Sequence, residues 1–266
     1  MNTYEHYKKI AVTRDNLIAT VTLNSPETLN AIDGDLHYEL STIFFDLAND
    51  TNVNVIILTG AGRAFCGGGD LRWVQQEIDK SHSYVESLKQ GRNIVMGIIE
   101  CPKPIICRLN GDAVGVGATI ALLSDMIIAV DSARITDPHV RIGLVAGDGG
   151  ALIWPQLIGF AKAKEFLLTG NGIKAPDAAQ LGLINYSVKA EDLDATVSKF
   201  STQMATASQA ALRFTKLCIN IPLRQMASSV LESSLAYEAI TMLQNEDLRE
   251  GISAFLEKRP AKFKGT

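Results

Sequence analysis

The chain has 266 residues, of which 47% are hydrophobic and 20% are charged, and this composition excludes a wholly disordered protein. Its 25 basic and 29 acidic residues give a formal net charge of −4, so the charge balance does not indicate a nucleic-acid partner. No stretch reaches the roughly 18 uninterrupted apolar residues of a membrane span, and residues 1–9 lack the apolar core of a signal peptide, so we expect a cytoplasmic protein that binds no membrane.

Strands and helices alternate in the first part of the chain. Runs rich in β-branched residues predict strands at 17–23, 53–59, 105–109 and 126–130. Apolar residues at helical spacing predict helices at 33–47, 116–123 and 161–168, a short helix between Pro176 and Gly182, and a long helix after 191. Residues from 208 onward carry almost no strand signal, and 230–256 predicts one or two long helices. We therefore expect an α/β core over residues 1–200 and a helical C-terminal region over residues 201–266.

The first glycine cluster, at residues 59–71, lies between a predicted strand and a predicted helix. Asp70 is suited to cap a helix that starts at Leu71. The three consecutive glycines, residues 67–69, let the backbone approach a ligand closely, and free N–H groups at a helix start favour negative charge. The segment is either a flexible turn or a binding loop for an oxygen on which negative charge develops.

The second glycine cluster, at residues 110–118, has the same position between a strand and a helix. Gly115 and Gly117 match the first half of a dinucleotide-binding motif, and Asp131 and Asp137 lie near the distance of its ribose-binding acid. Ile120 stands where that motif needs a third small residue, and neither cluster has the ending of a P-loop. Two junctions that each offer an N–H group therefore fit a two-donor oxyanion hole better than a nucleotide site.

The third segment, at residues 136–150, contains His139, one of 4 histidines in the chain, and Asp148 within a glycine-rich turn. Histidine titrates near neutral pH and serves as a general acid or base, and a nearby carboxylate orients the ring or raises its basicity. The alternative is a loop histidine beside an aspartate that caps a helix.

The 4 cysteines form no CxxC pair, which predicts free thiols, and nothing in the sequence suggests a metal site.

Seven segments in this order resemble the crotonase (enoyl-CoA hydratase/isomerase) superfamily over nearly the whole chain. They are LNAI (29–32), VIILTGAGRAFCGGGDL (55–71), CPKPIICRLNGDAVGVGA (101–118), SDMIIAVDSARI (124–135), RIGLVAGDGG (141–150), LLTGNGIKAPDAAQLGLIN (167–185) and EGISAFLEKRPAKF (250–263). The resemblance implies a crotonase-like spiral of repeated ββα units. It also implies C-terminal helices that assemble a homotrimer or a dimer of trimers.

The resemblance assigns roles to particular residues. By position, the N–H groups of Gly69 and Val116 form the oxyanion hole. The family's second donor is normally a glycine, but any residue other than proline supplies the N–H. The substrate is an acyl-CoA thioester, so coenzyme A is part of the substrate and no permanently bound cofactor is expected. The residues expected to contact it are Gly67, Asp70, Leu71, Arg72, Thr119, Phe255 and Lys258, the last from a neighbouring subunit.

The chain departs from the family at the catalytic positions. Family hydratases carry two glutamates that hold the added water, and the corresponding residues here are Thr119 and His139. His139 with Asp148 nine residues later, and Trp154 followed by Pro155, instead resemble the superfamily's β-diketone hydrolases, of which 6-oxocamphor hydrolase is the type. The SAFLEKR ending nevertheless resembles members that use CoA.

Three functions remain open from the sequence. The first is an enoyl-CoA hydratase-like lyase in which His139 and Asp148 replace the glutamates. The second is a hydrolase that cleaves a carbon–carbon bond of a β-diketone, with His139 activating water; in a variant of it, Asp148 is a covalent nucleophile. The third is an acyl-CoA-binding protein without catalytic activity.

Overall fold

A sheet of six strands forms the centre of the molecule. The structure is a computed structural model and describes residues 4–79, 84–244 and 246–265. The strand order is β1-β2-β3-β4-β6-β9, in which β1 is antiparallel to β2 and all other neighbours are parallel. The strands are β1 (Ile10–Asp15), β2 (Ile18–Leu23), β3 (Val55–Gly60), β4 (Ile105–Leu109), β6 (Met126–Val130) and β9 (Tyr186–Val188).

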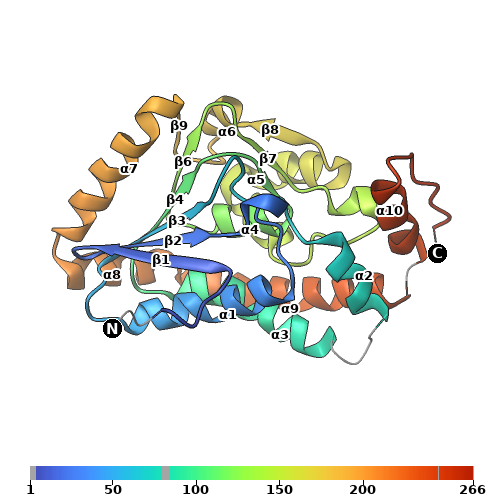
Figure 1. Ribbon diagram of the computed structural model, residues 1–266, viewed down its shortest axis with the longest axis horizontal. Helices are drawn as coiled ribbons and strands as arrows, with labels where there is room; N and C mark the ends of the chain where they lie inside the picture. The colour runs from blue at the N-terminus through green and yellow to red at the C-terminus, as the bar shows by residue number, and fades with distance from the viewer. Residues whose placement is uncertain (1–3, 80–83, 245, 266) are drawn as a thin grey trace.

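Helices cover both faces of this sheet, as Figure 1 shows. Helices α1 (Gly34–Asn49), α3 (Tyr84–Glu100) and α9 (Ile221–Gln244) lie on one side, and α7 (Ala190–Ala205) packs on the other. Strands β3 and β4 are buried along almost their whole length. Their continuous apolar sequences follow from this, because a parallel strand covered on both faces has no solvent side on which to place polar residues.

A smaller sheet lies beside the two glycine-rich loops. It has the strand order β5-β7-β8, made of β5 (Ala113–Val114), β7 (Arg134–Thr136) and β8 (Gly172–Lys174). An isolated bridge joins Cys66 to Ala113 and so holds the loop after β3 against β5. The remaining helices are α2 (Leu71–Asp79), α4 (Val116–Leu122), α5 (Gly150–Thr169), α6 (Ala175–Leu181), α8 (Gln209–Ile219) and α10 (Glu246–Leu256), with short 3-10 turns at Pro26–Thr28 and His139–Ile142.

The helix ends follow from their capping residues. The Asp33 carboxylate accepts a hydrogen bond from Leu36 N at 2.9 Å and starts α1. Asp70 accepts hydrogen bonds from Arg72 N at 2.8 Å and Trp73 N at 3.2 Å, which confirms it as the cap of α2. Gly182 ends α6 with φ 82°, a left-handed conformation that glycine adopts without steric cost.

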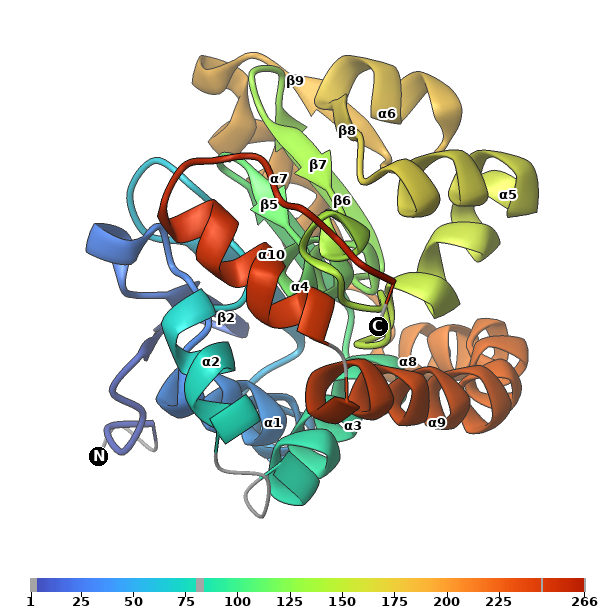
Figure 2. The same cartoon turned by 90° about the vertical axis from the view of Figure 1, so that its right-hand side faces the viewer.

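The α/β core and the helical C-terminal region agree with the sequence prediction. Three of the four predicted strands match within one residue, and β3 begins two residues later than expected. The C-terminal helices do not form a separate layer, because Leu231 and Leu235 of α9 belong to the main hydrophobic core. Figure 2 shows α9 beside α3, with α10 crossing in front of α4. The boundary expected at residue 200 lies within α7.

The predicted free thiols are present, with Cys66, Cys101 and Cys107 buried and Cys218 exposed. Within the ranges that the structure describes, no helix combines the length and hydropathy needed to cross a membrane.

Candidate active site

The two glycine clusters of the sequence lie side by side. Val114 N donates a hydrogen bond to Cys66 O at 3.0 Å, which aligns the loop before α2 with the loop before α4. Gly117 faces the same cysteine, and a Cβ atom at this position would lie 2.6 Å from Cys66 Cβ. Any larger residue at 117 would therefore push the two loops apart.

Backbone conformation leaves one amide of each loop available to a ligand. Gly68 has φ 92° and Gly115 has φ 53°, which are left-handed conformations that favour glycine. They precede Gly69 and Val116, and neither of these residues donates its N–H within the described parts of the chain. Both residues line the same inner cavity. This arrangement is suited to two N–H donors that stabilise an oxyanion.

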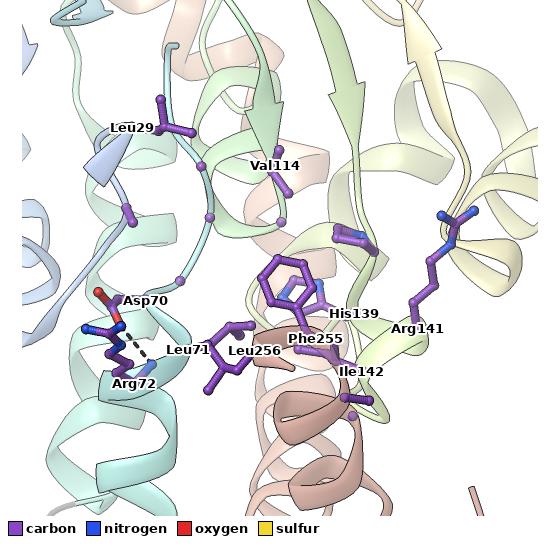
Figure 3. A pocket seen from close by; sticks show the side chains of 18 of the residues that line it. Leu29, Asp70, Leu71, Arg72, Val114, His139, Arg141, Ile142, Phe255 and Leu256 are labelled. Atoms are coloured by element: carbon purple, nitrogen blue, oxygen red, sulfur yellow. Dashed lines mark hydrogen bonds between the residues drawn. The ribbon is translucent and has the colours of Figure 1, made fainter. Parts of the chain in front are cut away.

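Two cavities with shared lining residues lie at this site. An outer cavity of about 700 Å³ opens between the glycine loops and α10, and Gly69 and His139 line both this cavity and an inner one of about 90 Å³. Figure 3 shows Phe255 and His139 inside the outer cavity, with Arg72 and Arg141 on opposite sides. The predicted substrate contacts that line it are Gly67, Asp70, Leu71, Arg72 and Phe255. Lys258 of the same chain is outside its lining.

His139 begins a 3-10 turn just after β7 and is held between two carboxylates. Its Nδ1 lies 2.5 Å from Asp137 Oδ1, and its Nε2 lies 3.5 Å from Asp148 Oδ2. The His139 side chain is 12% exposed, and the Asp137 side chain is 1% exposed. The structure therefore brings the predicted pair, His139 and Asp148, together and adds Asp137 as a third member.

Thr119 lies behind Asp148. It is fully buried in α4, and its hydroxyl donates a hydrogen bond to Asp148 Oδ1 at 3.2 Å. Thr119 lines neither of the two cavities. Its observed contact therefore orients the carboxylate of Asp148.

Glu238 of α9 is a further acid of the site, which the sequence prediction did not include. Glu238 and Asp148 line the inner cavity together, and Glu238 Oε2 is buried with no hydrogen-bond partner among the residues that the structure describes. Asp137 Oδ2 is buried without a partner as well. Buried polar atoms normally form hydrogen bonds, so unpaired carboxylate oxygens indicate groups kept available for a ligand or a proton.

The glycines around Asp148 make room for these acids. A Cβ atom at Gly147 would lie 2.6 Å from Glu238 Oε2, and one at Gly150 would overlap Asp137 Oδ2. Ser234, one turn before Glu238 on α9, donates a hydrogen bond from its hydroxyl to Gly147 O at 2.8 Å. The glycine-rich turn thus joins the loop of Asp148 to the helix of Glu238.

Burial and mutual charge shift the proton affinities of this cluster. Burial opposes the positive charge of His139, but Asp137 and Asp148 outweigh it and raise the pKa of the ring to about 10. Burial also raises the pKa of Asp148, against the effect of the His139 charge. Burial and the charge of Asp148 raise the pKa of Glu238 to about 8. At neutral pH the site therefore contains an imidazolium ion and a protonated glutamic acid.

Ligand atoms of Asp137, His139 and Asp148 lie within 4.8 Å of one another, a spacing that also suits a metal ion. The contact between Asp137 and His139 Nδ1 leaves only Nε2 of the ring for such an ion. The absence of a metal stays a prediction.

The contact between Gly150 and Asp137 leads to a testable prediction. We expect Gly150→Ala to lower kcat about 100-fold, because the added methyl group displaces the carboxylate that orients His139. The matched control is Gly159→Ala, since Gly159 has φ 73° and an added Cβ would have no neighbour within 4 Å. The control should lose stability through backbone strain and keep its activity. Thermal unfolding and steady-state kinetics check both variants, and equal activities would contradict the role given to Gly150.

Comparisons with known proteins identify relatives that match almost the whole chain. A 1,2-epoxyphenylacetyl-CoA isomerase of Escherichia coli is 33% identical to the chain over 93% of its length and 95% of the relative. A short-chain-enoyl-CoA hydratase of Clostridium acetobutylicum is 32% identical over 94% of this chain and 95% of the relative.

Solved structures share the fold. The crystal structure of an enoyl-CoA hydratase/isomerase from Mycobacterium paratuberculosis aligns with TM-score 0.90 and 34% identity, covering 94% of this chain and 99% of the other. A β-diketone hydrolase from Anabaena sp. PCC 7120 aligns with TM-score 0.86 and 24% identity, covering 94% and 98%, and this likeness shows the fold alone. The family described as enoyl-CoA hydratase/isomerase matches residues 13–266, which run from the middle of β1 to the last residue. The chain therefore belongs to this family.

Proposed function

We propose that this protein adds water across the double bond of an enoyl-CoA, with Asp148 as the base and Glu238 as the acid. The observation that carries the proposal is that the carboxyl groups of Asp148 and Glu238 line one small cavity together with Gly69 and Val116, whose N–H groups have no acceptor among the described residues. With a pKa of about 8, Glu238 holds a proton at neutral pH. Burial raises the pKa of Asp148, and the neighbouring His139 cation acts against this and favours the ionised carboxylate. Addition of water needs one group in each protonation state.

The steps follow from these positions. Asp148 removes a proton from water, and the water oxygen attacks the β-carbon of the enoyl group. The electron pair of the double bond moves onto the thioester oxygen, where the N–H groups of Gly69 and Val116 stabilise the enolate. Glu238 then donates its proton to the α-carbon and completes the 3-hydroxyacyl-CoA. The proton on Asp148 returns to Glu238 before the next turnover, so the enzyme is unchanged.

His139 has a different role here from the one expected from the sequence. A ring with a pKa of about 10 is already protonated at neutral pH and is a poor base. We assign it to hold Asp148 in place and to supply a positive charge beside the forming enolate. Asp137 keeps the ring in position through its contact with Nδ1 at 2.5 Å.

The outer cavity is suited to the CoA part of the substrate. Arg72 and Arg141 lie on opposite sides of it, and guanidinium groups bind phosphates well. Arg259 also lines the cavity, but Glu250 and Glu257 already pair with it. A Lys258 from a neighbouring subunit, in a trimer or a dimer of trimers, stays a prediction, as does a cytoplasmic location.

Two considerations support hydration over the other reactions of the family. The name of the short-chain-enoyl-CoA hydratase, 32% identical to this chain, describes water addition to a thioester. The pair of acids in the inner cavity also provides the two proton-transfer groups that this reaction uses.

A second candidate is hydrolytic cleavage of a carbon–carbon bond in a β-diketone. The contact of Asp137 with His139 favours it, because a carboxylate on Nδ1 is a common way to orient a histidine that activates water. In this reaction, water attacks one ketone carbonyl, and the carbon–carbon bond breaks to give a carboxylic acid and an enolate that takes up a proton.

A product screen by mass spectrometry distinguishes these functions. Purified protein is incubated with enoyl-CoA thioesters and with linear and cyclic β-diketones, both free and linked to CoA. We expect enoyl-CoA to gain one water reversibly and the Glu238→Gln variant to lose this activity. Cleavage of a diketone with enoyl-CoA unchanged would establish the second candidate. Tight CoA binding with no product in either panel would indicate the non-catalytic alternative.

A further inference from the structure

A second group of polar side chains lines the inner cavity beside its apolar walls. It consists of His37 of α1, Trp73 and Glu77 of α2, and Ser87 of α3. His37 is 9% exposed, and its ring centroid lies 5.1 Å from that of Trp73. Ser87 donates a hydrogen bond from its hydroxyl to the Glu77 carboxylate at 2.6 Å. Burial lowers the pKa of His37, and the hydrogen bond to Gln90 and the charge of Glu77 act against it.

The contacts of His37 determine which of its nitrogen atoms accepts a hydrogen bond. Burial lowers the pKa of His37, so the ring is neutral at neutral pH. Its Nδ1 lies 2.9 Å from Gln90 Oε1, and because an amide oxygen only accepts, Nδ1 carries the proton. Nε2 is then an acceptor. Across residues 4–79, 84–244 and 246–265, no group donates a hydrogen bond to it.

Gly91 leaves space beside this acceptor. A Cβ atom at position 91 would lie 3.9 Å from His37 Nε2 and 3.8 Å from Leu235 Cδ2. Leu235 is one helical turn before Glu238 on α9, and all four residues line the inner cavity. His37 Nε2 therefore faces the space that continues from the catalytic acids.

We propose that the inner cavity selects a short acyl chain that carries a hydroxyl group, which donates a hydrogen bond to His37 Nε2. The inference shares one assumption with the proposed function, which is that the protein binds a CoA thioester and that the acyl group occupies this cavity. An unsubstituted acyl chain would cover this acceptor without donating a hydrogen bond to it. None of the described residues that line the cavity is a lysine or arginine, and the cationic ring of His139 is already held between Asp137 and Asp148, so the cavity offers no free cation to a chain that ends in a carboxylate.

Binding of saturated acyl-CoA ligands tests the inference without turnover. Isothermal titration of the wild-type protein compares butyryl-CoA with 4-hydroxybutyryl-CoA, and pentanoyl-CoA with 5-hydroxypentanoyl-CoA and glutaryl-CoA. We expect the hydroxyl group to tighten binding about tenfold in at least one pair, and glutaryl-CoA to bind more weakly than pentanoyl-CoA. Equal or weaker binding of both hydroxylated ligands would overturn the proposal.

The variant His37→Leu then identifies the acceptor. Its affinity for the hydroxylated ligands should fall to that for the plain ligands, whereas His6→Leu, at a side chain 62% exposed, should keep the preference. A hydroxyl preference that persists in His37→Leu would overturn the proposal, and the wild-type comparison does not depend on the folding of this variant. Hydroxyl preference without hydration of any enoyl-CoA would contradict the proposed function alone. Hydration of crotonyl-CoA without hydroxyl preference would contradict this inference alone.

Discussion

Replacing His139 with glutamine is expected to lower kcat for water addition by about a thousandfold or more and to change KM less than about threefold. Glutamine can still form hydrogen bonds with Asp137 or Asp148, but it cannot carry the charge of an imidazolium ring. That charge favours ionised Asp148 and adds to the stabilisation of the enolate, and the loss of one electrostatic group of this kind typically costs about 10²–10³ in rate. The outer cavity keeps its arginines and Phe255, so binding of CoA should change little.

Steady-state kinetics on a substrate found in the product screen measure this effect. His6→Gln is the control, since His6 is an exposed histidine beside Asp46 on the surface. Circular dichroism and thermal unfolding confirm that the His139 variant is folded. A His139→Gln variant with wild-type kcat would show that the ring takes no part in the reaction.

Replacing Glu238 with glutamine is expected to reduce kcat at least about 100-fold and to remove the alkaline limb of the pH profile. In the wild-type protein, activity should fall as the pH rises through about 8, because Glu238 then loses the proton that it donates. The variant has no proton to lose at this position, so its residual activity should not decline there. Glu232→Gln, an exposed residue of the same helix, is the control.

The same variant should gain stability at high pH. The pKa of Glu238 in the folded protein, about 8, lies above the ordinary value of 4.5, so the folded state binds this proton more tightly than the unfolded state. The contribution is complete below about pH 4.5 and is lost as the pH rises through 8. We expect Glu238→Gln to exceed the wild type in free energy of unfolding by more than about 1 kcal/mol at pH 9. Urea unfolding at pH 6 and pH 9 checks this, and equal pH dependence of both proteins would contradict it.

Much of the fold follows from local sequence patterns. Strands β3 and β4 show as continuous apolar runs because both of their faces are covered, and Asp33, Asp70 and Gly182 mark helix ends through local capping. Strand β1 was not predicted, since its outer half is exposed and carries Thr13, Arg14 and Asp15 in place of alternating apolar residues. Helix α3 was not predicted from the sequence either.

The residues of the site also fall into two groups: those that the sequence identified and those that it did not. His139 and Asp148 were identified from the chain because they stand in one segment with a distinctive glycine turn, and Gly69 and Val116 follow glycines at two strand-to-helix junctions. Asp137 was considered only as a ribose-binding acid. A side chain two residues before His139 shows its role only when the backbone turn brings its oxygen to Nδ1.

By itself, the sequence determined the α/β core, the helical C-terminal region and both glycine loops, and it identified His139 and Asp148 as candidates, because each of these features depends on residues close together in the chain. Only the tertiary structure decided that α9 packs against α3 and α5 and brings Glu238 to the inner cavity. The same holds for His37 and Glu77, which α1 and α2 place on the wall of that cavity. Helical periodicity shows which residues share a face of a helix but not which distant helix that face meets, and burial of charged groups, which sets their pKa values, depends on that packing.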